Sequence, residues 1–132
     1  MIEKLINEYE VPADSIVPES AHCLHPKFLE KQLEDSLQRL NLECLDVMYL
    51  HNPYEGQGPF NTDNVFFDRL QEAFEFMERM VEEGKIKQYG LATYSSLRTK
   101  PTESKMHLSL QKVTRLAQKV VGEDKEHNFK FI

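Results

Sequence analysis

Apolar positions along the chain follow two alternating periods, one typical of amphipathic helices and the other of buried strands. The first long helix is predicted to begin at Pro26, a residue suited to an initial helical turn, and to end at Leu40. Its apolar stripe recurs every three or four residues: Leu29, Leu33, Leu37 and Leu40. A short apolar run over 45–50 follows at once and predicts a buried strand.

The same succession of helix and strand is repeated twice more. A second helix is predicted to begin near residues 63–64, where either side chain suits an N-cap, and to end at Gly84. A strand over 86–94 follows. A third helix, closed by Gly122, leads to a final strand over 129–132. Strands separated by helical crossovers predict a parallel sheet and an α/β fold, either an open sheet or a barrel.

The remaining segments are predicted to carry less regular structure. Residues 1–9 indicate a short amphipathic helix, and two prolines make 11–21 irregular. A Gly-, Pro- and Asn-rich stretch over 54–64 and a polar stretch over 95–105 are predicted to be loops.

The second helix is rich in glutamate, which favours a solvated face over paired-carboxylate catalysis. That face is predicted to hold the acidic residues Glu72, Glu75, Glu78, Glu82 and Glu83. Phe76 lies off the main apolar stripe and is expected to be partly exposed.

Composition narrows the classes of function. The chain has 132 residues, enough for one domain, and a net charge of −6, which argues against nucleic acid or an anionic membrane as a partner. Its apolar runs are too short to span a bilayer, and its start has acidic residues where a signal peptide is basic. We therefore expect a cytoplasmic protein with free thiols at Cys23 and Cys44.

Residues 22–25 read His-Cys-Leu-His, which is a candidate for half of a metal site. The remaining cysteine and histidines are scattered, so no second half is evident. Local packing of a loop before the helix at Pro26 is the alternative interpretation, and we predict no metal site.

Three motifs are more specific than periodicity. Residues 36–40 read S-L-Q-R-L, residues 46–53 read D-V-M-Y-L-H-N-P, and residues 84–90 read G-K-I-K-Q-Y-G. In this order and at these separations they resemble the central signatures of the aldo-keto reductase family: S-L-x-x-L, D-x-x-x-L-H-x-P and G-K-I-x-x-x-G. The resemblance is strongest over 20–132.

The resemblance implies a (β/α)8 barrel that reduces aldehydes or ketones by hydride transfer from NADPH or NADH. We expect residues 1–132 to form a single partial barrel domain, in which 45–50 corresponds to the fourth strand, 86–94 to the fifth and 129–132 to the start of the sixth. The family's tyrosine, lysine and aspartate belong to earlier strands that this chain does not match.

Only the histidine of the family's catalytic tetrad maps onto this chain, as His51. Its implied role is to hydrogen-bond and polarise the substrate carbonyl. At the end of the fifth strand many members carry Ser-Asn, which holds the nicotinamide, whereas this chain has Ala92-Thr93. Thr93 offers a hydroxyl there and is the candidate cofactor-binding residue.

Three hypotheses about function stay open. The chain is a fragment of a carbonyl reductase that is inactive and does not bind the cofactor alone, or a non-catalytic reductase-like binding or regulatory module, or part of an enzyme completed by another chain. We favour the fragment, because the sequence ends within an apolar strand. A slice of a barrel leaves two sheet edges open, which predicts self-association.

Overall fold

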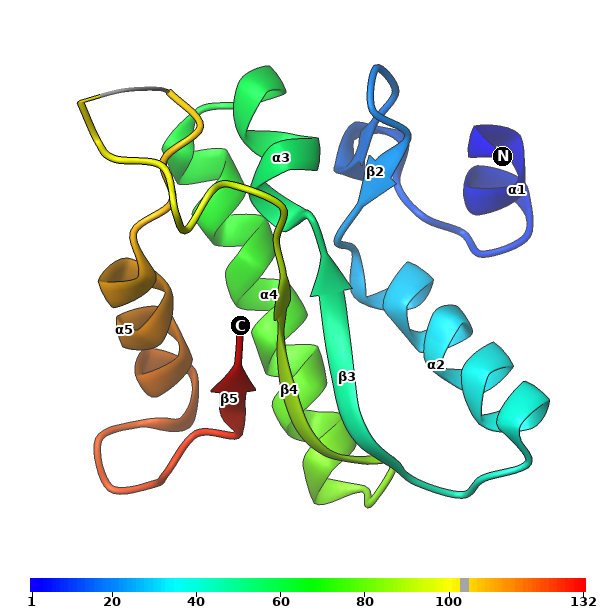
Figure 1. Cartoon of the computed structure of the whole chain (residues 1–132). Coiled ribbons are helices and arrows are strands. Elements are labelled where there is room, and N and C mark those ends of the chain that lie inside the picture. The colour runs from blue at the N-terminus through cyan, green and yellow to red at the C-terminus, as the bar shows by residue number, and fades with distance from the viewer. Residues whose placement is uncertain (103–104) are drawn as a thin grey trace.

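A parallel sheet forms the centre of the protein, whose computed structural model describes residues 1–102 and 105–132. Its strand order is β3 (Leu45–His51), β4 (Ile86–Ala92) and β5 (Phe129–Phe131) (Figure 1). Both neighbouring pairs are parallel. Three long helices alternate with the strands: α2 (Pro26–Leu40), α4 (Asp63–Glu82) and α5 (Leu110–Val121). The predicted order of helices and strands is therefore confirmed.

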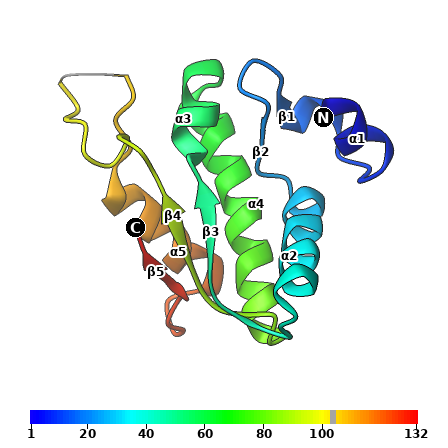
Figure 2. The ribbon, with the colours of Figure 1, turned by 45° about the vertical axis from the view of Figure 1, so that its right-hand side comes forward.

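The helices form one layer behind the sheet, and no helix of the described residues covers its opposite face (Figure 2). Tyr49 and Phe131 meet edge to face on that opposite side, with ring centroids 6.2 Å apart. Leu50, the next residue of β3, is buried against the helices, as alternation along a strand requires. Parallel strands alternating with helices on one side are the arrangement of a partial (β/α)8 barrel, so this predicted fold class is confirmed.

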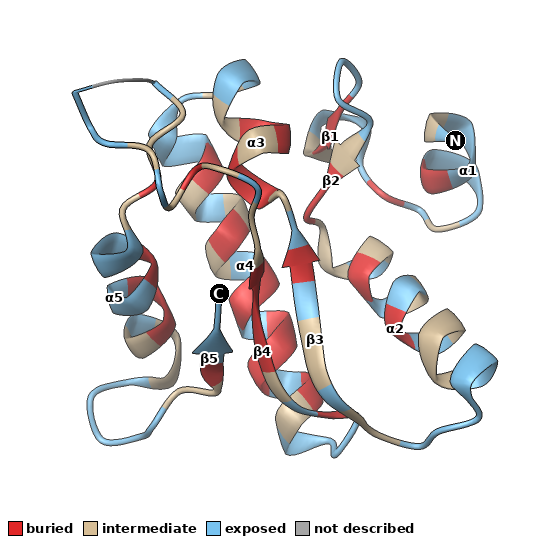
Figure 3. Cartoon of the chain, in the orientation of Figure 1, coloured by how far each residue is buried: buried red, intermediate tan, exposed pale blue. Residues whose placement is uncertain are grey.

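The main core lies between α4 and the sheet. Phe74 of α4 is fully buried and contacts Tyr89 of β4 and Phe129 of β5, with ring centroids 5.2 and 5.4 Å apart. Buried positions are concentrated on α4 and β4 (Figure 3). Aromatic rings bury the largest apolar areas of any side chains, so these three rings hold α4 against two strands at once.

Helix caps explain where the long helices begin and end. The His25 side chain caps α2 by accepting a hydrogen bond from the Lys27 amide at 3.3 Å. Thr62, rather than residue 63 or 64, is the N-cap of α4, because its side chain accepts from the Val65 amide. Gly84 has a φ of +73°, the left-handed conformation that closes a helix and favours glycine.

The segment before α2 has more order than its two prolines predicted. A short helix, α1 (Ile2–Asn7), is followed by the 3-10 turn η1 (Ala13–Ser15) and by an antiparallel pair, β1 (Ile16–Val17) and β2 (His22–Cys23). A small second core holds this region together: Leu5, Val11, Ile16 and Cys23. The prediction of irregular structure over 11–21 was wrong for β1, and β2 lies just beyond that range. Strands of two residues are too short for periodicity to reveal.

The loop predicted over 54–64 is also partly wrong. Helix α3 (Pro53–Gln57) and the 3-10 turn η2 (Gly58–Phe60) occupy most of it. Pro53 stands at the first position of α3, where its missing N–H costs nothing. The glycines of this stretch suggested a loop, but Gly56 is buried inside the helix.

Two side chains of α4 are more buried than predicted. Phe76 is 1% exposed, not partly exposed, and Glu78 is 9% exposed, not solvated. Glu78 Oε1 accepts hydrogen bonds from the Tyr89 hydroxyl and the Asn128 amide, and Oε2 accepts from the Asn128 side chain. A buried carboxylate needs such partners, and they lie too far away in sequence for a helical pattern to reveal.

The strand predicted over 86–94 ends at Ala92, and the next residues turn away from the sheet. In the polar loop predicted over 95–105, residues 103 and 104 lie outside the described residues. Among the residues described, no helix is long and apolar enough to cross a membrane.

Candidate functional site

His51 is the last residue of β3, and its side chain is exposed at the carboxyl end of the sheet. The chain turns sharply after it, because Asn52 adopts a left-handed conformation with φ 44° and ψ 48°. Asparagine tolerates this conformation better than most residues. Pro53 then begins α3. The carboxyl ends of parallel strands are where barrel enzymes place their catalytic groups, so His51 occupies the position that its predicted role requires.

The two site residues predicted from the sequence lie at the same end of neighbouring strands. His51 is paired with Ala92 in the parallel register, and Thr93 directly follows Ala92. Thr93 is partly exposed, and the ring of Tyr94 beside it is 76% exposed. The structure thus brings the predicted carbonyl-orienting residue and the predicted cofactor residue together.

Glu55 of α3 fixes the loop that follows β4. Its Oε1 accepts hydrogen bonds from the backbone amides of Tyr94, Ser95 and Ser96, each at 3.0 Å. Burial opposes ionisation of this carboxyl group, but the hydrogen bonds from Ser95 and Ser96 outweigh it, so the pKa of Glu55 lies below its ordinary value. Asn52 Oδ1 also accepts from the Tyr94 amide at 3.0 Å. The loop beside Thr93 is therefore held by α3.

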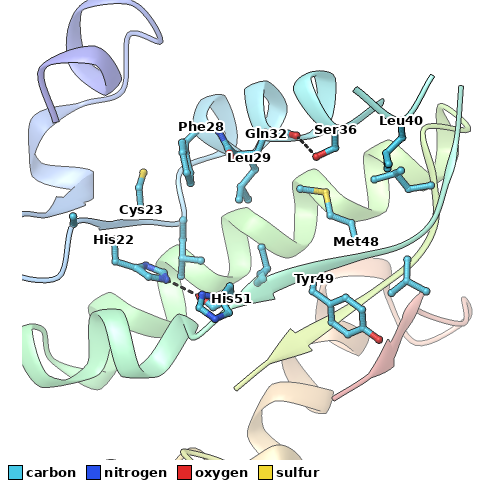
Figure 4. Close-up of a pocket in the computed structure, with 15 residues that line it drawn as sticks. His22, Cys23, Phe28, Leu29, Gln32, Ser36, Leu40, Met48, Tyr49 and His51 are labelled. Atoms are coloured by element: carbon cyan, nitrogen blue, oxygen red, sulfur yellow. Dashed lines mark hydrogen bonds between the residues drawn. The ribbon is translucent and has the colours of Figure 1, made fainter. Parts of the chain in front are cut away.

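His22 reaches the same region from the hairpin of β1 and β2. Its Nε2 lies 2.9 Å from the backbone carbonyl oxygen of His51 (Figure 4). Its Nδ1 lies 3.2 Å from the side-chain nitrogen of Gln57. Gln57 is fully buried and accepts a hydrogen bond from Arg69 of α4 at 2.6 Å. Burial lowers the pKa of His22 below its ordinary value, so this ring is neutral at pH 7.

A cavity of about 520 Å³ lies between α2 and β3 and reaches His51. Most of its lining is apolar and comes from both elements (Figure 4). Met48 and Tyr49 project to opposite sides of β3 in this view. The lining includes Phe28, Leu29, Leu40, Leu45, Val47, Met48 and Leu50. The cavity therefore runs along the outer edge of the sheet, beside the strand that carries His51.

The two histidines of the His-Cys-Leu-His stretch have different partners. The His22 ring contacts the His51 carbonyl and Gln57, whereas the His25 ring caps α2. Within residues 1–102 and 105–132, no group of three or more histidine, cysteine, aspartate or glutamate side chains is arranged to hold a metal ion. The ring of His22 thus joins the hairpin to β3 and α3, whereas the ring of His25 stays with its own helix.

Comparison with known protein families shows which family the chain belongs to. The model of the aldo/keto reductase family matches residues 15–115, which include α2, β3, α4 and β4. The chain belongs to the aldo/keto reductase family. Members of this family are oxidoreductases, and the match spans His51 and Thr93.

Individual aldo-keto reductases are similar to this chain at 31 to 35% identity. Aldo-keto reductase family 1 member A1 of Rattus norvegicus is 35% identical over 80 residues, covering 54% of this chain and 25% of the rat protein. The NADP(+) aldo-keto reductase yakc of Schizosaccharomyces pombe is 31% identical over 71 residues, covering 54% of this chain and 18% of the yeast protein. Aflatoxin B1 aldehyde reductase member 2 of Homo sapiens is 32% identical over 79 residues, covering 60% of this chain and 19% of the human protein. The chain thus matches only about a fifth to a quarter of the length of these relatives.

Sequence reasoning missed the residues that hold the site in place. Glu55 and Gln57 were assigned to a loop, and His22 was considered as half of a metal site or as part of local loop packing, not as a partner of the His51 backbone. Pro53 after a strand-end residue was the available signal, because proline is favoured at the first position of a helix. The partners of Gln57 lie on β2 and α4, and no local pattern indicates them.

Proposed function

We propose that this chain supplies the carbonyl-orienting part of the active site of an NADPH-dependent aldo-keto reductase. The observation that carries the proposal is the position of His51. It ends a parallel strand within an L-H-x-P motif, is exposed at the carboxyl end of the sheet, and pairs with Ala92, next to the loop after β4. A ring N–H at this position donates a hydrogen bond to the carbonyl oxygen of an aldehyde or ketone, and the bond strengthens as negative charge develops there.

The cofactor side of the proposed site is carried by Thr93. Glu55 holds the three amides that follow Thr93, so the loop keeps its place before any cofactor arrives. The partly exposed Thr93 hydroxyl fits a polar group such as the nicotinamide carboxamide. NADPH or NADH, when bound, supplies the hydride. His51 and Thr93 bind and orient, and neither supplies the proton that completes the reduction.

The family's proton-donating tyrosine, with its lysine and aspartate, has no counterpart here, so we propose that the chain is inactive alone. A chimera tests this: the aligned segment of the rat relative is replaced by the corresponding segment of this chain. We expect the chimera to bind NADPH, by cofactor fluorescence, and to oxidise it with a small aldehyde, whereas this chain alone does neither. A chimera that binds NADPH but reduces nothing would favour a non-catalytic binding module.

We also propose self-association through the open sheet edges. The cavity beside β3 is lined mainly by apolar side chains, and the other outer strand presents Phe131 and Ile132, which are 37% and 67% exposed. A second copy of the chain that placed its β5 against β3 would cover both apolar surfaces. Light scattering at increasing concentration should show dimers or larger species, and a monomer at every concentration would contradict this proposal.

A further inference from the structure

The polar contacts around His22 fix the positions of its hydrogens. The guanidinium of Arg69 only donates, so the side-chain oxygen of Gln57 accepts from it at 2.6 Å. The Gln57 nitrogen must then donate to His22 Nδ1 at 3.2 Å. The remaining ring hydrogen lies on Nε2, which is 2.9 Å from the His51 carbonyl oxygen, a group that only accepts. A single tautomer, with its hydrogen on Nε2, satisfies all three contacts.

The packing around His22 is as specific as its hydrogen bonds. A Cβ added at Gly56 of α3 would overlap the His22 ring, so only glycine allows the ring to lie this close to the helix. Ser20, in the turn between β1 and β2, donates a hydrogen bond to the Gly56 carbonyl at 2.6 Å. Arg69 also donates to the Asp14 carbonyl at 2.5 Å. Ser20 thereby attaches the hairpin to α3, and Asp14 attaches the preceding turn η1 to α4.

We propose that His22 is a positioning residue for the proposed carbonyl site, holding the end of β3 through an Nε2–H···O hydrogen bond to the His51 backbone. The inference rests on the proposed function, since it concerns how His51 is presented. The His51 carbonyl immediately precedes the left-handed turn at Asn52, where the direction of the chain sets the direction of the His51 side chain. Fixing this carbonyl fixes the backbone from which the His51 side chain projects, without a contact to the substrate.

The positioning role requires a neutral His22. Protonation would add a hydrogen to Nδ1, which would then face the N–H of Gln57, and the contact would become repulsive. Burial is the main cause that lowers the pKa of His22. The hydrogen bond to the His51 backbone of β3 raises this pKa, and the electrostatic effect of the His51 ring lowers it. Glu55 of α3 acts in the opposite direction. Cys23 lies beside it on β2, and Arg69 of α4 faces it across Gln57.

The tautomer can be read directly from the intact chain. Long-range nitrogen–proton correlation NMR on protein with 15N-labelled histidine distinguishes a protonated Nε2 from a protonated Nδ1. At pH 7.5 we expect the His22 hydrogen on Nε2, with Nδ1 giving the signal of an unprotonated acceptor. A hydrogen on Nδ1, or a charged ring, would overturn the proposal. Failure of the chimera to reduce an aldehyde would overturn the proposed function instead and would leave this result unchanged.

Variants test whether the bond positions His51. His22→Leu should shift the His51 ring signals and accelerate hydrogen exchange of the Asn52 amide, which donates to Ala92, roughly three- to tenfold. His22→Gln should restore both readouts towards those of the unmodified chain, because a glutamine amide can also donate to the His51 carbonyl. Gly56→Ala should displace the ring and mimic His22→Leu while keeping the histidine.

His25→Asn is the matched control, because asparagine retains the helix cap and His25 does not contact His51. Unchanged His51 signals in both His22→Leu and Gly56→Ala would overturn the proposal, as would equal shifts in His25→Asn. If His22→Leu fails to fold, the tautomer of the unmodified chain and the Gly56→Ala variant still decide the question.

Discussion

Two buried polar networks differ in the kind of group at their centre. The Glu78 network, formed by Glu78, Tyr89 and Asn128, surrounds a carboxylate with three donors where β5 begins. The His22 network, formed by His22, Gln57 and Arg69, is a chain of hydrogen bonds. Arg69 donates to Gln57, Gln57 donates to His22, and His22 donates to the His51 carbonyl.

The central group sets how each network responds to pH. Burial, helped by the adjacent Glu78, raises the pKa of the Tyr89 hydroxyl, so that it remains a donor. The His22 ring, in contrast, can gain a proton, and its Nδ1–H would then face the N–H of Gln57. The carboxylate network stabilises the fold. A network built around a neutral histidine can also change its hydrogen bonding when the ring gains a proton. The second kind lies beside the proposed site.

The largest effect is expected from Glu78→Ala. The substitution leaves the Tyr89 hydroxyl and the amide and side-chain nitrogen of Asn128 without their acceptor, in a region that water reaches poorly. We expect a loss of about 2 to 4 kcal/mol in the free energy of unfolding, measured by urea denaturation. Glu72→Ala, at an exposed position of the same helix, is the control and should leave the urea midpoint unchanged. Equal effects of the two would show that Glu78 is not a structural acceptor.

A smaller loss is expected from Gln57→Leu, about 1 to 3 kcal/mol in the same assay, because His22 Nδ1 and Arg69 each lose a buried partner. Gln57→Glu sharpens the comparison, because it places a carboxylate between Arg69 and His22. That carboxylate accepts from a protonated Nδ1, so the pKa of His22 should rise in an NMR titration. No rise would mean that Gln57 does not face His22 in solution.

Acid should weaken the His22 network. Burial lowers the pKa of His22 in the folded chain, so below about pH 6.5, the ordinary histidine value, the unfolded chain binds a proton that the folded chain does not. Stability is then lost as pH falls. Burial lowers the pKa of His25 as well, so the relevant measurement is the difference in urea midpoint between the unmodified chain and His22→Gln from pH 7.5 to 5. This difference in urea midpoint should become smaller as the pH falls. A difference that stays constant would show that protonation of His22 does not weaken the folded chain.

The smallest effect is expected from Lys87→Met, which removes an exposed ion pair with Asp46. The hydrogen bond between the two lowers the pKa of Asp46 and raises that of Lys87. Surface pairs contribute little, since water and salt screen them. The urea midpoint should not change at 0.15 M salt. A loss of stability comparable to that of Gln57→Leu would contradict the comparison. It would show that the buried networks contribute no more to stability than an exposed ion pair does.

Periodicity predicted the repeating part of the fold well, because each long helix has an apolar stripe and each strand has apolar runs. His51 came instead from the resemblance to the aldo-keto reductase family, because Leu50, His51 and Pro53 match its L-H-x-P motif. Periodicity alone does not single it out. It failed where partners are distant in sequence. In the sequence, Glu78 cannot be distinguished from the acidic residues of an exposed helix face. It is buried because Tyr89 and Asn128 pack against it and donate hydrogen bonds to it. Gly56 suggested a loop, although its role is to admit the His22 ring.

The most direct test of the central claim is the single-turnover rate of hydride transfer in the chimeric reductase at saturating NADPH, with and without His51→Leu, which removes the ring donor. The account predicts a rate lower by about 100-fold, the order expected for losing one donor to a developing oxyanion, with the NADPH dissociation constant unchanged. A rate equal to that of the parent chimera would contradict it, because His51 would then not hold the carbonyl.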